Sequence, residues 1–141
     1  MKNVAKYLRP AYKTALTGIT YNGENIPVYE TTTSVTLPNY YIEILNVTDA
    51  NVDNDAKFIR EVNVDVEIFT KQYKYQNNNA VDEISEDATQ AILSVIGGNL
   101  DTTAFQIGHI NLSSSRYLYE DDNGHYITRK ILSFTQLVTQ K

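Results

Sequence analysis

Cysteine and tryptophan are both absent from this chain of 141 residues, and proline and glycine are scarce, at three and six residues. Without cysteine there is no disulfide framework, no thiolate ligand for zinc or an iron–sulfur cluster, and no thiol nucleophile. A chain of this length matches one ordinary domain, and it can bury enough apolar surface to fold without a metal or a crosslink. We therefore predict a single domain over residues 1–141 with an ordinary hydrophobic core.

Positive charge is also in short supply, because 12 lysines and arginines stand against 17 aspartates and glutamates, giving a net charge of −5. Such a balance repels a phosphate backbone and argues against a protein that coats or reads nucleic acid. The bases and tyrosines at 71–75 resemble a surface for single-stranded nucleic acid, but the run is short and has no basic patch beside it. Tyrosine, in contrast, is abundant, with 11 residues, and half-buried tyrosines suit contacts between subunits.

Long apolar runs are missing as well. The longest mostly apolar segment, residues 91–98, is far too short to cross a bilayer. Residues 1–7 carry positive charge, but Arg9 and Lys13 interrupt the stretch that follows, so the apolar core of a signal peptide is lacking. We expect no membrane partner and synthesis in a cytoplasm.

Periodicity predicts two helices and a series of strands. Apolar residues recur at helical spacing over residues 4–16, in spite of Pro10, and again over residues 80–96, which Asn79 can cap and Gly97-Gly98 can end. Residues 30–38 are predicted to be a long exposed connection, and residues 48–57 and 71–79 polar loops. Strands are predicted at 19–21 and 26–29, joined by an Asn22-Gly23 turn, then at 40–46, 58–70, 105–112, 116–119 and 126–138, with a turn at 122–124.

The strand at 58–70 alternates strictly between apolar and polar residues. Val62, Val64, Val66 and Ile68 face one way, so we expect one side of the sheet to be core and the other to be wet. Runs of strands with two segregated helices predict an α+β fold, in which a mainly antiparallel sheet carries two helices packed on one face.

Residues that could support chemistry are present, but not in the patterns that chemistry needs. The acidic stretch at 49–55 begins like a calcium loop, yet Asn54 stands where the loop needs glycine and Arg60 where it needs a bidentate glutamate. His109 and His125 have no nucleophile elbow beside them. Glu83 and Glu86 lie at the amino-terminal end of a helix, where they complement the helix dipole. We therefore predict a protein that is not an enzyme, with no catalytic, metal-binding or cofactor-binding residues.

The order of elements gives a further indication. A first helix, a hairpin carrying Ile26-Pro27-Val28-Tyr29, a strand Tyr40-Tyr41-Ile42-Glu43-Ile44, a long alternating strand, one crossing helix and closing strands resemble the tail completion (tail terminator) proteins of tailed bacteriophages. The resemblance covers nearly the whole chain. It implies a non-enzymatic virion subunit, assembled in the host cytoplasm into a closed neck ring, with six copies favoured and twelve left open. The ring would join portal-side connector proteins to tail proteins and let DNA pass without sequence readout.

Two surfaces are predicted for such a subunit. Tyr73 and Tyr75, if the chain is still extended there, project to the same side and dock, with the 30–38 arm, on an adjacent subunit or a neighbouring ring. The alternative is that both rings fold back onto the core. An acidic surface near the channel would let DNA slide. Its predicted members are Asp49, Asp53, Asp55, Glu61, Asp65 and Glu67.

Two other functions stay open on the sequence. Another head–tail connector component, an adaptor or a stopper, would form a ring of a different copy number with a different neighbour. A small ligand-binding or hydrolytic domain would instead need a concave pocket with convergent polar groups.

Overall fold

A computed structural model of the chain describes residues 3–21, 23–30, 37–51, 59–73, 79–96, 100 and 102–141. Its elements are α1 (Val4–Leu16), β1 (Thr20–Tyr21), β2 (Glu24–Asn25), β3 (Val28–Tyr29), β4 (Tyr40–Asn51), β5 (Ile59–Tyr73), α2 (Asn79–Ile96), β6 (Phe105–Ile107), β7 (Asn111–Asp122) and β8 (His125–Gln140).

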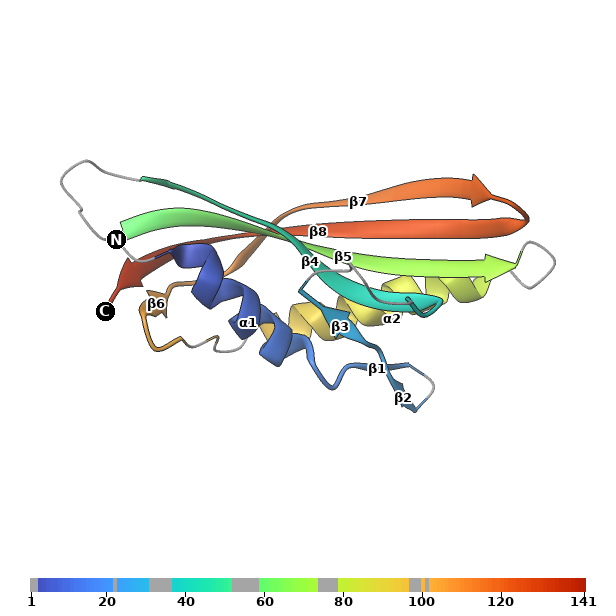
Figure 1. Ribbon diagram of the computed structural model, residues 1–141, viewed down its shortest axis with the longest axis horizontal. Helices are drawn as coiled ribbons and strands as arrows, with labels where there is room; N and C mark the ends of the chain where they lie inside the picture. The colour runs from blue at the N-terminus through green and yellow to red at the C-terminus, as the bar shows by residue number, and fades with distance from the viewer. Residues whose placement is uncertain are drawn as a thin grey trace.

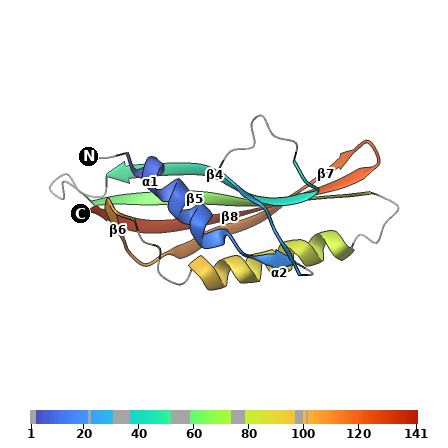
Figure 2. The same ribbon diagram turned by 60° about the horizontal axis from the view of Figure 1, so that its bottom comes forward.

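The main sheet is long and twisted, and both helices lie on one of its faces (Figures 1 and 2). Its strands follow the order β3-β4-β5-β8-β6, and β7 also pairs with β8. Every pair in it is antiparallel except β3 with β4. The predicted α+β fold, with two helices on one face of a mainly antiparallel sheet, is confirmed.

The core forms where the alternation of β5 places it. Val62, Val64, Val66 and Ile68 are at most 1% exposed and face the helices. They pack in one cluster with apolar residues that recur at helical spacing on α1 and α2, among them Leu8, Tyr12, Leu16, Ala88 and Ile92. We call this side of the sheet the helix face and the opposite side the outer face.

Local signals at both ends explain the bounds of α1, which match the prediction. The Asn3 side chain accepts hydrogen bonds from the backbone amides of Ala5 (3.0 Å) and Lys6 (3.4 Å), as an N-cap does. At the other end the Thr17 amide donates to the Lys13 carbonyl at 3.0 Å. The helix continues through Pro10, and α2 begins at Asn79, which was predicted to be its cap.

Two strand predictions near the amino terminus need correction. The hairpin around residues 22–23 exists, but it pairs Tyr21 with Glu24, so its second strand is Glu24–Asn25 and not 26–29. Val28–Tyr29 instead joins the main sheet parallel to β4, where the Pro27 carbonyl accepts from the Ile42 amide at 2.8 Å. Part of the predicted polar loop at 48–57 is also strand, because a bulge between Ile44 and Val47 lets β4 continue to Asn51.

The carboxy-terminal strands are divided differently from the prediction. The strand expected at 105–112 is interrupted at 108–110, and β7 then runs without a break from Asn111 to Asp122. The turn predicted at 122–124 is confirmed, since Asn123 (φ 47°) and Gly124 (φ 84°) both adopt the positive φ that a two-residue hairpin turn requires. We call β7 together with its paired part of β8, residues 111–135, the hairpin arm.

Candidate interaction surfaces

The predicted acidic surface is only partly assembled. Glu61 is exposed and Asp65 half-buried on the outer face, where the Ser133 hydroxyl donates to Asp65 at 2.6 Å. Asp49 pairs in register with Val62, which puts it on the helix face, and it forms an ion pair of 2.9 Å with Arg60. Asp53 and Asp55 lie outside the described residues.

Glu67 corrects the expectation of a uniformly wet outer face, because it is only 3% exposed. A second apolar cluster of Tyr41, Phe69 and Ile127 lies on that face, with Tyr29 packed against it. The rings of Tyr41 and Phe69 stack with centroids 4.7 Å apart. Burial, followed by the nearby charge of Glu67, raises the pKa of Tyr41. Residues from β3, β4, β5 and β8 therefore form an apolar cluster at one end of the outer face, which is not uniformly wet.

Arg129 ties this cluster to the hairpin arm. Its guanidinium donates to Glu67 on β5 at 3.1 Å and to Glu120 on β7 at 3.3 Å, and it lies 5.0 Å from the centre of the Phe69 ring. Burial by itself would lower the pKa of Arg129, but the hydrogen bond and the charge of Glu67 raise it above its ordinary value. One side chain thus bridges three neighbouring strands.

The predicted tyrosine contact remains untested. Tyr73 is the last residue of β5, where its backbone pairs with His125, and Tyr75 lies outside the described residues. Residues 31–36 of the predicted docking arm are also outside them.

On the helix face a polar cluster, which the sequence analysis did not identify, joins the hairpin arm to α2. Lys130, 5% exposed, donates to Glu86 on α2 at 3.1 Å and to the Tyr117 hydroxyl at 3.2 Å. The Tyr117 hydroxyl donates to the same carboxylate. These hydrogen bonds, first from Tyr117 and then from Lys130, lower the pKa of Glu86. One feature of the sequence could have indicated this cluster, namely two tyrosines two residues apart, which share a face of a strand. In the structure Tyr119 stacks on Tyr117 with ring centroids separated by 5.5 Å.

The hairpin arm also concentrates exposed apolar side chains. Of seven large hydrophobic residues that are exposed in the described part of the chain, four lie on the hairpin arm. They are Leu112 (41% exposed), Leu118 (44%), Tyr119 (66%) and Tyr126 (37%); Leu137 (48%) follows on β8, just beyond the arm. Within the described residues, β7 pairs with a strand on the β8 side only.

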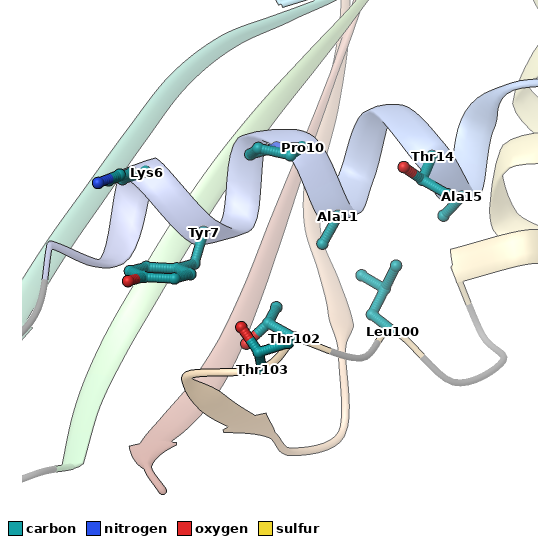
Figure 3. A pocket seen from close by; sticks show the side chains of 9 residues that line it. All are labelled: Lys6, Tyr7, Pro10, Ala11, Thr14, Ala15, Leu100, Thr102 and Thr103. Carbon is teal, nitrogen blue, oxygen red and sulfur yellow. The ribbon is translucent and has the colours of Figure 1, made fainter.

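A groove of about 490 Å³ lies at the other end of the fold, between α1 and the segment before β6 (Figure 3). We call it the α1 groove. Tyr7, Pro10, Ala11, Ala15 and Leu100 give it apolar walls, and Lys6 stands at its rim. A second hollow, of about 460 Å³, is lined by Glu61 and His109 together with uncharged residues of β7 and β8.

The described residues contain no group of three or more histidine, aspartate or glutamate side chains placed to hold a metal ion. None of their helices is both long enough and apolar enough to span a membrane.

Comparison with known proteins gives a fold relationship. No protein-family model matches the sequence, and a comparison with curated proteins gives no match. Among solved structures, the fold is similar to that of a chain in a structure described as the virion of a native gene transfer agent (GTA) particle. The TM-score is 0.72, the sequence identity 13%, and the alignment covers 99% of each chain. At this identity the likeness shows a shared fold from end to end.

Proposed function

We propose that this protein is a structural subunit of a bacteriophage-type neck ring, a tail completion or tail terminator protein that joins the capsid connector to the tail. The observation that carries the proposal is the fold likeness over 99% of both chains to a chain from a GTA virion particle. A full-length match favours a subunit of the same kind over a shared motif in unrelated proteins. The finer assignment to the neck rests on the order of elements, which resembles the tail completion proteins.

The surface of the fold supports an assembly role. Exposed apolar side chains scattered singly are normal for a soluble protein, but a concentration of them marks a contact site. Here they gather on one hairpin arm, next to an open strand edge. An assembly subunit needs such a surface, which its neighbours cover.

The proposed ring would surround DNA without reading its sequence. Each subunit brings a net charge of −5, so a channel lined by these subunits repels the phosphate backbone and lets DNA slide. This proposal retains Glu61 and Asp65, which lie on the outer face. Asp53 and Asp55, outside the described residues, stay proposed members of the acidic surface. Buried Glu67 is excluded from it.

Native mass spectrometry of the full chain, alone and with co-expressed neck and tail proteins, tests the ring. The expected result is one cyclic oligomer, six copies being favoured, which appears as a closed ring in electron-microscopy class averages. A chain that stays monomeric in every mixture would overturn the proposal. A ring of another copy number, bound to another neighbour, would instead indicate an adaptor or a stopper.

A further inference from the structure

We propose that the hairpin arm of one copy docks in the α1 groove of the next copy, so that the ring closes head to tail. This inference rests on the proposed ring and names the surfaces that build it. The two surfaces lie at opposite ends of the long axis: the β7–β8 turn is at the right of Figure 1, and the start of α1 is at the left. The turned view in Figure 2 shows the same separation.

The hairpin arm has the properties of an interface that awaits a partner. Tyr119 is 66% exposed and Leu118 44% exposed, although adjacent residues of a strand point to opposite faces. Both faces of the arm therefore present apolar surface beside the open edge of β7. The ties through Lys130 and Arg129 hold the arm against α2 and β5 before any partner binds, which reduces the entropy lost on docking.

The opposite edge of the sheet is partly covered within the chain. β3 pairs with residues 42–43 of β4. Just beyond, the Arg9 guanidinium donates to the carbonyls of Ile44 at 2.8 Å and Leu45 at 2.7 Å, at the bulge. Natural sheets use bulges and charged side chains to protect an edge in this way. This partial protection of β4 favours docking of the arm on a different surface of the neighbouring copy.

The α1 groove fits the arm in charge and in apolar character. α1 has no acidic side chain and two exposed lysines, Lys13 and the groove-lining Lys6, while its Arg9 is bound to the β4 edge. The tip of the arm carries Asp121 and Asp122 next to the apolar Leu118–Tyr119 pair, and Glu120 beside them pairs with Arg129. An arm with acidic and apolar residues thus meets a groove with apolar walls and basic neighbours. Opposite charges at the rim of a contact steer association and fix its register.

A contact between two different surfaces of the same chain has a consequence for symmetry. Such a contact is heterologous, and repeating it gives a closed ring when the rotation between copies closes. A two-fold pairing of β7 with β7 would stop at a dimer. The proposed arm-in-groove contact is therefore of the type that a ring requires.

Cysteine crosslinking can test the contact directly, because the natural chain has no cysteine. Tyr119→Cys places a thiol on the arm, and Ala11→Cys places one in the α1 groove. Under mild oxidation the double variant of the full chain should give a ladder of covalent oligomers that ends at the ring size. Equal mixtures of the two single variants should give dimers, and neither single variant alone should crosslink. Ala11→Cys combined with Glu61→Cys, an exposed outer-face position, is the matched control.

Charge reversal supplies a second measurement. Lys6→Glu with Lys13→Glu should weaken self-association, and Asp121→Lys with Asp122→Lys in the same chain should restore it. Both lysines are exposed, so the reversal should leave the unfolding temperature nearly unchanged. Lys71→Glu is the control for the loss of positive charge outside the groove.

The outcomes separate the two proposals. If the double variant assembles into rings but gives no ladder of crosslinked oligomers, the docking contact is overturned and the proposed ring function is not. Crosslinking of Tyr119→Cys with itself would replace the contact with a two-fold pairing. If neither rings nor a ladder form, with or without the neck and tail proteins, both proposals fail.

Discussion

Replacing Arg129 by methionine should destabilise the protein more than neutralising the carboxylate that it binds. Glu67 is 4% exposed at its side chain, and Arg129 is the charged group that compensates it. Removing one partner of a fully buried pair costs about 3–5 kcal/mol, because the remaining charge is left without compensation. Arg129 is 32% exposed, so water can reach part of the vacated site, and we expect about 2–3 kcal/mol. Loss of the contact with the Phe69 ring adds about 0.5–1 kcal/mol.

The reverse change, Glu67→Gln, leaves no buried charge, and Arg129 keeps Glu120 as a partner. We expect it to cost about 1 kcal/mol. The double variant should then be more stable than Arg129→Met alone, because the carboxylate that the single variant strands is gone. Urea denaturation followed by circular dichroism measures all three, with an unchanged slope as the check that the unfolding transition is the same. Equal losses from the two single variants, or a double variant less stable than Arg129→Met, would refute this account of the bridge.

Three further predictions concern other parts of the fold. Tyr12→Phe removes the hydroxyl that donates to the buried Oε1 of Gln136, whose amide still donates to the Val62 carbonyl at 2.6 Å, and should cost about 1–2 kcal/mol. Burial raises the pKa of Tyr12, so wild-type stability should fall as pH rises above about 10, and a Tyr12→Phe variant with the same alkaline loss would contradict this. The pKa of Glu86 is lowered by hydrogen bonds from Tyr117 and the buried lysine beside it, so wild-type unfolding temperatures should fall as pH drops below the ordinary carboxylate range, whereas Glu86→Gln should give a flatter curve. Replacing Tyr73 and Tyr75 together by alanine should reduce assembly and leave monomer unfolding nearly unchanged; assembly at the wild-type yield would count against their role.

Elements whose signals are local could be predicted from the sequence. The first helix has its cap at Asn3 and its stop at residues 17–18, and the structure places its ends at those signals. The helix face of β5 follows from strict alternation. The same alternation could not predict the burial of Glu67, because its ion-pair partner Arg129 lies 62 positions away in the sequence. A pattern within one strand tells which face a residue shares, not what lies over that face.

Pairing partners were the second kind of information that the sequence did not reveal. Residues 28–29 were predicted to pair within the hairpin, but they pair with β4 as a parallel strand instead. β7 continues through Ser113–Ser115 because β8 pairs with Ser114 and Ser115, while a bulge leaves Ser113 outside the register. Arg9 protects the β4 edge by donating to the carbonyls of Ile44 and Leu45, which lie 35 and 36 positions later in the sequence. Contacts of this kind appear only once the sheet order is known.

The Tyr117-Leu118-Tyr119 run on β7 shows how a local conflict in a sequence can indicate function. In a half-exposed strand, polar and apolar residues alternate, and a run of three large apolar or aromatic residues is typical of a strand covered on both faces. In the single chain this run lies on an edge strand, with Tyr119 and Leu118 both exposed. The pattern therefore suits an assembled state more than the isolated subunit. Residues 42–45 of β4 are covered at the opposite edge of the sheet, and in the proposed ring the next copy would supply the cover that the run requires.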